Sequence, residues 1–247
     1  MYSTQTVDRV LQLCVANRTT REVSRLTSIP ESTIAHWRRG DRRTGRRAAC
    51  PRCSSTGLPD SYSYLLGSYL GDGHITTGRR GVHALSISCA DAWPGVMNEV
   101  EAAMREALGR AVCHVQRHGC VDVKSYSRHW TCLFPQHGPG PKHSRPIRLS
   151  GWQQEAVARH QGRFLRGLFH SDGCRISNWT RRRVAGEWKR YEYPRYVFTN
   201  TSQDILGLCA AALDQLGIAY TRPRADTISV ARRAAVAALD VHVGPKS

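Results

Sequence analysis

The chain has 247 residues, 40% of them hydrophobic, which suffices for one large core or two modest ones. No apolar run reaches the length of a membrane span, and the start lacks the basic-then-apolar order of a signal peptide, so we expect a cytoplasmic protein without membrane contact. The 36 basic residues against 19 acidic ones give a formal charge of +17, which favours a polyanionic partner and association with the nucleoid if the protein is bacterial.

Arginine carries nearly all of this charge, since only four of the basic residues are lysine: Lys124, Lys142, Lys189 and Lys246. The planar guanidinium suits phosphate and guanine, so double-stranded DNA is the expected partner. High-GC codon usage would explain arginine in place of lysine, but it would not explain the net excess. The nine cysteines are irregularly spaced, which favours free thiols over a disulfide framework.

Residues 1–45 are predicted to form a helix-turn-helix-like DNA-binding module. The stretch "REVSRLTSIPESTIAHWRRG" predicts a short helix, a turn at "SIP" and a second helix, with Val23 and Leu26 packing inward from the first and Ile34 with Trp37 from the second. An ordinary small helical bundle is the alternative. Helix 31–39 would present these side chains to a DNA groove: Ser32, Thr33, His36, Arg38 and Arg39.

Residues 46–60 are predicted to be a linker, next to the basic run "RRGDRRTGRR". The linker holds Cys50 and Cys53 as a Cys-x-x-Cys, which is half of a zinc site. No second pair with fitting spacing follows, and spacing does not select among the residues that would complete a site: His36, Cys113, His114, His118 and Cys120. We therefore expect two unpaired thiols in a turn, with zinc as the less favoured alternative.

An internal repeat organises residues 61–247. The stretch "YLLGSYLGDGHI" at 64–75 returns as "RFLRGLFHSDGCRI" at 163–176, with a constant offset that pairs Asp72 with Asp172. Small residues stand four apart in each copy and so share one helix face: Gly67, Gly71, Gly167 and Ser171. Such faces can approach backbone to backbone, so we predict a close contact between one helix of each half.

The same geometry predicts that Asp72 and Asp172 lie side by side at the C-terminal ends of the two helices. A carboxylate there opposes the helix dipole, and two of them repel each other, so the arrangement favours a cation between them. Magnesium, a hard ion that prefers carboxylate and water oxygens, is the expected metal.

With these features, "LLGSYLGDG" and "LRGLFHSDG" resemble the two signature helices of a single-chain, two-repeat LAGLIDADG homing endonuclease, over about residues 60–245. The resemblance implies an α+β fold of two pseudo-symmetric αββαββα halves, residues 61–148 and 149–247, whose antiparallel sheets form a saddle that reads the major groove. It also implies a monomer that cuts both DNA strands, with Asp72 and Asp172 as metal ligands and catalytic residues. The strand and helix patterns between the motifs agree with this order in both halves.

Family members often place a basic residue at the end of each half's fourth strand. Aligning "SYSRH" at 125–129 with "SVARR" at 229–233 puts Arg128 and Arg232 there, with Lys124 as a competitor in the first half. Both arginines are therefore predicted catalytic residues that offset charge at the phosphate, although arginine does not exchange a proton. The glycine- and proline-rich segment 130–146 is predicted to be a loop between the halves.

These features predict a site-specific, metal-dependent endonuclease that hydrolyses phosphodiester bonds of double-stranded DNA. The alternative is a DNA-binding transcription regulator built on the same scaffold that does not cleave, which the N-terminal helix-turn-helix and the arginines in place of lysines favour. RNA binding is a third candidate function, which these features favour less than the other two.

Overall fold

The computed structural model describes the whole chain except residues 1, 3, 16–17, 40–49 and 247. The chain divides into two compact units, Met1–Ala48 and Ala49–Ser247. Most of the basic run and the predicted boundary between module and linker lie outside the described residues. Among the helices that are described, none has the length and apolar character needed to cross a membrane.

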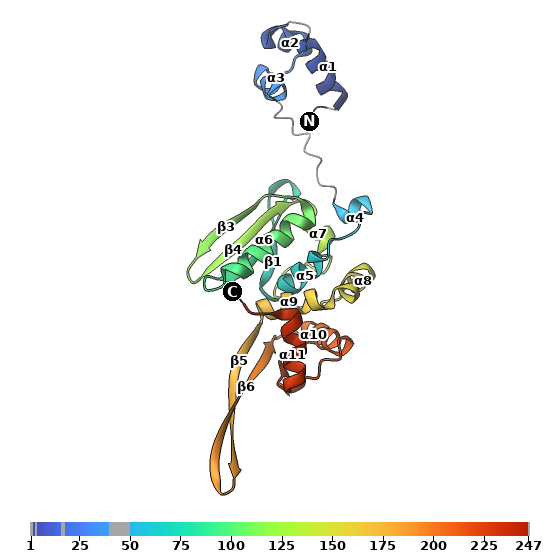
Figure 1. Ribbon diagram of the computed structural model, residues 1–247. Helices are drawn as coiled ribbons and strands as arrows, with labels where there is room; N and C mark the ends of the chain where they lie inside the picture. The colour runs from blue at the N-terminus through green and yellow to red at the C-terminus, as the bar shows by residue number, and fades with distance from the viewer. Residues whose placement is uncertain (1, 3, 16–17, 40–49, 247) are drawn as a thin grey trace. The chain divides into compact units, whose positions relative to one another are not determined.

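The first unit contains the helices α1 (Thr4–Val15), α2 (Thr20–Thr27) and α3 (Glu31–Arg38) (Figure 1). Thr19 and Glu22 form a capping box that starts α2. The core consists of Val10, Val23, Ile29 and Ile34.

The prediction that Leu26 packs inward is wrong, because its side chain is 60% exposed. Ser28 adopts a left-handed conformation that ends α2 and turns the chain, and the buried Ile29 then fills the core.

The second unit consists of two halves with the same order of elements. The first half runs α5 (Ser61–Asp72), β1 (Gly73–Thr77), β2 (His83–Ala90), α6 (Pro94–Leu108), β3 (Val112–Arg117), β4 (Cys120–Ser127) and α7 (Trp130–Leu133). The second runs α9 (Gln161–Ser171), β5 (Gly173–Val184), β6 (Glu187–Thr199), α10 (Gln203–Gln215), β7 (Thr221–Arg224), β8 (Thr227–Val230) and α11 (Arg233–Val243). Helix α4 (Pro51–Ser54) precedes the first half, α8 (Gly151–Arg159) precedes α9, and short 3-10 helices lie at Arg79–Gly81 and Lys142–Ser144.

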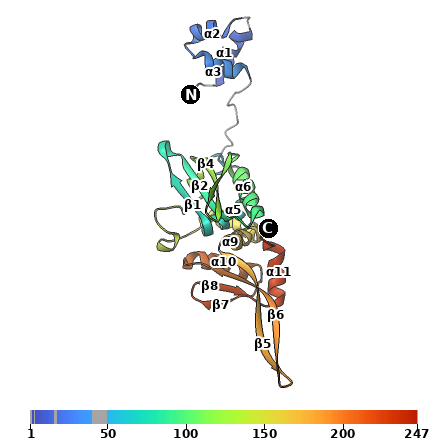
Figure 2. The same cartoon turned by 90° about the vertical axis from the view of Figure 1, so that its left-hand side faces the viewer.

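Each half has one four-stranded antiparallel sheet, with strand orders β1-β2-β4-β3 and β5-β6-β8-β7. The first residue after each signature aspartate pairs at the equivalent place, since Gly73 pairs with Ile87 and Gly173 with Phe198. The predicted α+β class and the αββαββα order are confirmed. One hydrophobic core runs through both halves, and Figure 2 shows α5 and α9 side by side between the two sheets.

The halves differ in their first hairpin. Strands β5 and β6 have 12 and 13 residues, whereas β1 and β2 have 5 and 8. Only Tyr196–Thr199 of β6 pair with β8, so the outer hairpin is a two-stranded ribbon that projects beyond its sheet (Figure 1). Its two-residue turn has positive φ at Ala185 and Gly186, as the right-handed strand twist requires.

The segment 130–146 is not the simple loop that was predicted. It begins with α7, and Trp130, Leu133 and Phe134 are fully buried. The Phe134 ring lies 4.5 Å from that of Tyr69, and Trp130 Nε1 donates to the carbonyl of Ser125. The aromatic side chains thus bind this segment to α5 and β4, despite its glycines and prolines.

Candidate functional site

Glycine lets the two signature helices meet backbone to backbone. A Cβ added to Gly67 would lie 2.8 Å from Leu168 N, and one added to Gly167 would lie 2.8 Å from Ser68 N. One added to Gly71 would collide with the Ser171 side chain. Since real Cβ atoms do not approach backbone this closely, a hydrogen atom is all that fits on the glycines of this interface.

The helix contact brings the two aspartates together. Asp72 ends α5 and Asp172 directly follows α9. A Cβ on Gly71 would lie 3.0 Å from Asp172 Oδ2, so the Asp172 carboxylate reaches the end of the opposite helix. Solvent reaches the Asp72 side chain, while Asp172 is half-buried.

The surroundings of the pair disfavour two negative charges. Burial among protein atoms and then the Asp172 charge raise the pKa of Asp72 to about 6, and burial also raises the pKa of Asp172. A divalent cation would relieve this repulsion, and carboxylates from two separate elements are suitable hard ligands for it. The donor set of Asp72 and Asp172 therefore fits a hard divalent cation.

Two lysines accompany the aspartates, and sequence reasoning missed both. Lys142 Nζ donates to the carbonyl oxygens of Tyr69 at 2.6 Å and Gly73 at 2.8 Å, and also to that of Gly71. Lys246 Nζ repeats the arrangement on α9, donating to Gly173 O at 2.7 Å and Ser171 O at 3.5 Å. Each ammonium group thus caps the C-terminal end of a signature helix, where the helix dipole favours a cation.

The charges of the lysines act directly on the acids. Burial lowers the pKa of Lys142 to about 8, and the two aspartates oppose that shift. Burial also lowers the pKa of Lys246, again against the pull of both carboxylates. The site therefore consists of two acids and two bases in a partly desolvated cluster.

A signal for these lysines is present in the sequence. The tripeptide Gly-Pro-Lys occurs at 140–142 and again at 244–246, each time after the last helix of a half. Because the first copy lies in a segment with the composition of a loop, its role is clear only when the chain folds back onto α5.

The predicted arginines do not lie beside the aspartates. Arg128 follows Ser127, the last residue of β4, which is aligned through His83 with Thr77 at the far end of β1. Five strand residues, about 17 Å, separate Thr77 from Asp72. Val230, the last residue of β8, is aligned through Tyr196 with Arg175 of β5. Arg232 lies two residues beyond Val230, at the start of α11. Both arginines are exposed, and the strand direction carries them away from the helix ends. The cations whose charges act on both aspartates are instead Lys142 and Lys246.

Lys124, the competing candidate, is engaged elsewhere. Its Nζ lies 3.1 Å from Asp122 Oδ2, and Ser88 and Arg117 donate to the same carboxylate. Burial alone would raise the pKa of Asp122, but these three donors together lower it to about 2. Lys124 is thus held in an ion pair on the sheet.

The two acids have different neighbours. Asn200 Nδ2 donates to Asp172 Oδ2 at 2.6 Å. The strand register puts Cys89 at the equivalent place of the first half, where burial and then the Asp72 charge raise the thiol pKa to about 12. A neutral thiol is a weak donor, so Asp72 lacks the amide donor that orients Asp172.

The predicted recognition helix forms in the first unit. Ser32, His36, Arg38 and Arg39 are exposed and Thr33 is half-buried. Arg38 Nη1 also donates to Thr20 Oγ1 at 3.0 Å, which ties α3 to α2.

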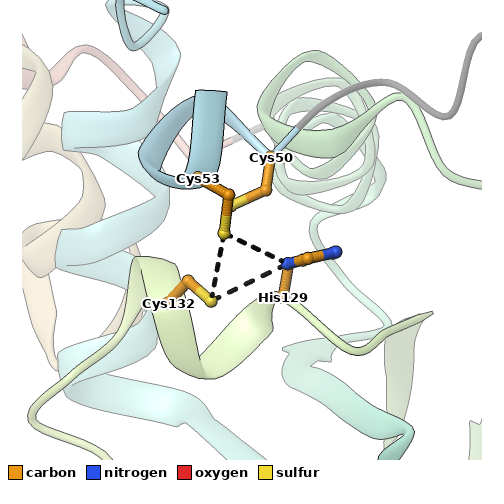
Figure 3. A group of neighbouring side chains, drawn as sticks. All are labelled: Cys50, Cys53, His129 and Cys132. Carbon is orange, nitrogen blue, oxygen red and sulfur yellow. Dashed lines mark hydrogen bonds between the residues drawn. The ribbon is translucent and has the colours of Figure 1, made fainter. Parts of the chain in front are cut away.

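Cys50 and Cys53 do not stand alone, and their neighbours in the second unit are residues that the spacing did not single out. The structure brings them to His129 and Cys132 of the α7 region, and the ligand atoms of all four residues lie within 4.8 Å of one another (Figure 3). Among the earlier candidates, His114 instead contacts Glu101 at 2.7 Å. The missed signal is a His-x-x-Cys at 129–132, which spans the start of the segment predicted to be a loop.

No protein-family model matches the sequence, and no curated protein matches it. Solved structures similar to the chain include mesophilic variants of the homing endonuclease I-DmoI, at 12% identity and TM-score 0.47 over 75% of this chain and 96% of theirs. They also include the LAGLIDADG homing endonuclease I-SmaMI bound to cleaved DNA, at 10% identity and TM-score 0.46 over 76% and 84% of the two chains. The N-terminal LAGLIDADG domain of WhiA aligns at 13% identity and TM-score 0.43 over 83% and 93%. The last two of these structures are described as LAGLIDADG proteins.

Proposed function

We propose that the second unit is a metal-dependent endonuclease that hydrolyses double-stranded DNA at specific sites. The observation that carries this proposal is the cluster at the paired helix ends, where Asp72 and Asp172 meet and Lys142 and Lys246 cap the helices. Two like charges held together against their mutual repulsion are poor for stability, which is typical of a functional site.

Asp72 and Asp172 would hold the divalent cation. When bound, the metal would lower the pKa of an attacking water and neutralise charge on the scissile phosphate. The protein's own groups prepare the site. The glycine interface holds the two carboxylates together, and Asn200 orients that of Asp172.

The lysines have an electrostatic role in this proposal. All three donors of Lys142 are taken by carbonyl oxygens, so this residue positions the end of α5 and adds positive field rather than transferring a proton. Lys246 makes two such bonds to described residues, and its third N–H would donate to a phosphate oxygen. The positive field would stabilise negative charge that develops on the phosphate.

The β5–β6 ribbon supplies the proposed DNA contact. Its strands hold seven basic and two acidic residues, and its exposed aromatic side chains include Trp179, Trp188 and Tyr191. Arg181 and Arg190 stack on Trp179. A two-stranded ribbon fits the major groove of B-DNA, and basic side chains on it would contact phosphates and guanine edges. Because the first half has no comparable ribbon, we expect an asymmetric target with a longer footprint on the side of the second half.

The test is selection of bound duplexes from a randomised library by the full chain, followed by incubation of the selected duplexes with magnesium. Wild type is expected to cut both strands, whereas Asp72→Asn and Asp172→Asn are expected to bind without cutting. Asp91→Asn, an exposed acid outside the cluster, is the matched control and should cut normally. Failure to select any duplex would refute DNA recognition.

A second candidate function is a regulator that binds DNA without cleaving it. The observation that favours it is the first unit, in which α2, a turn and α3 have the order of a helix-turn-helix. Specific binding that is independent of magnesium, with no product above the Asp72→Asn background, would support this function over the nuclease.

A further inference from the structure

A cluster of soft ligands lies apart from the aspartates and has no role in the proposed cleavage. Cys50 and Cys53 belong to α4 and its start, while His129 and Cys132 belong to α7 and its start (Figure 3). Each pair is three residues apart, so both members of a pair lie on one side of their helical turn. The two short helices thus present four metal-ligating atoms to one point.

The distances among the Cys53, His129 and Cys132 ligand atoms match tetrahedral zinc, and the Cys50 sulfur lies within 4.8 Å of all three. With Zn–S near ~2.3 Å and Zn–N near ~2.05 Å, a tetrahedron places two sulfurs ~3.8 Å apart and a sulfur and a nitrogen ~3.6 Å apart. The Cys53 and Cys132 sulfurs are separated by 3.9 Å, and His129 Nδ1 lies 3.6 Å from the first and 3.8 Å from the second. A disulfide would require about 2.05 Å, and all the cysteines in the described part of the chain are free.

The backbone around the cluster also suits a bound metal. The amides of Cys53 and Ser54 each donate to the Cys50 carbonyl oxygen at 2.9 Å, so backbone hydrogen bonds close the turn that presents Cys50 and Cys53. The Arg52 guanidinium stacks 4.4 Å from the Trp152 ring, which holds positive charge near a site with three thiolates.

We propose that α4 is clamped onto α7 by one structural zinc ion bound by Cys50, Cys53, His129 and Cys132. Four protein ligands fill the tetrahedral shell, so the ion has no open position for a substrate and does not act in catalysis. Thiolate and imidazole ligands select zinc, whereas the carboxylates of the proposed cleavage site select magnesium. The chain therefore separates two metals by ligand chemistry.

The clamp has a physical purpose. Helix α4 has four residues, which is too short to be stable alone, and it buries little beyond Cys50 and Pro51. Helix α7 is already fixed by the buried Trp130 and Leu133. Zinc would thus attach a weakly held segment, at the very start of the second unit, to a firmly packed one.

The experiment measures zinc in the full chain, purified under reducing conditions, by elemental analysis. About one zinc per chain is expected in wild type, and none or nearly none in Cys53→Ser and Cys132→Ser. Cys113→Ser and Cys174→Ser replace exposed cysteines outside the cluster and should retain the metal. His129→Cys should also retain it, whereas His129→Ala should bind it at least about tenfold more weakly.

Two further measurements keep the test decisive where a variant folds poorly. Cobalt(II) added to metal-free wild type should give the intense visible bands and thiolate charge transfer of tetrahedral coordination. Chelation of zinc should increase deuterium uptake at residues 50–56 while the core helices α5 and α9 stay protected. Folded wild type that takes up no zinc, that holds iron instead, or that carries a Cys53–Cys132 disulfide under reducing conditions would overturn the proposal.

Discussion

Replacing Asp72 with asparagine is expected to stabilise the second unit near neutral pH. The pKa of Asp72 is about 6 in the folded protein against a model-compound value of 3.8, because of burial and the Asp172 charge. When the pKa of a carboxyl is higher in the folded than in the unfolded chain, the folded state becomes less stable as pH rises from 3.8 to about 6. The shift corresponds to about 3 kcal/mol. Solvent screening of this exposed side chain reduces the expected gain for Asp72→Asn to about 1 kcal/mol.

The assay is urea unfolding of the full chain in a chelator, at a series of pH values from about 4 to about 8. The advantage of Asp72→Asn should appear only toward the upper end, and Asp91→Asn should stay within about 0.5 kcal/mol of wild type. In a second series with magnesium in place of the chelator, the metal should stabilise wild type and not Asp72→Asn, since only the former keeps both proposed ligands. An advantage that is absent, or equal at all pH values, would refute the electrostatic reasoning.

Three further predictions follow from the same region. Gly67→Ala should destabilise the second unit by about 3 kcal/mol in urea unfolding, because its Cβ would meet backbone of the opposite helix, whereas Gly207→Ala on the open face of α10 should be neutral or stabilising. Asn200→Ala should raise the pKa of Asp172, as measured by carboxyl NMR titration, and an unchanged titration would show that the amide does not support the charged form. Lys142→Met should lower the free energy of unfolding by about 2 kcal/mol, because three carbonyl groups lose a charged donor, and wild-type stability would contradict the capping role.

The repeat and its consequences could be predicted because they depend on local spacing. Small residues four apart define a helix face, and the same offset that pairs Gly67 with Gly167 pairs Asp72 with Asp172. Alternating and helical hydrophobic patterns between the motifs predicted the αββαββα order of each half. These periodicities are properties of a helix or a strand and do not require knowledge of distant contacts.

The basic residues of the site could not be assigned in the same way. Alignment of strand ends suggested Arg128 and Arg232, but the strands run away from the helix ends, so residues at their far ends are distant from the acids. Lys142 reaches α5 from a segment about seventy residues further along the chain. Its position depends on the buried aromatic side chains that fold this segment back.

By itself the sequence determined the two-fold organisation, the glycine contact between the signature helices and the pairing of the two acids, because each follows from residue spacing within one element. Tertiary structure alone decided which cations accompany the acids and which residues join Cys50 and Cys53. Both outcomes depend on side chains about seventy or more positions apart that meet only after packing, and no local periodicity encodes such a meeting.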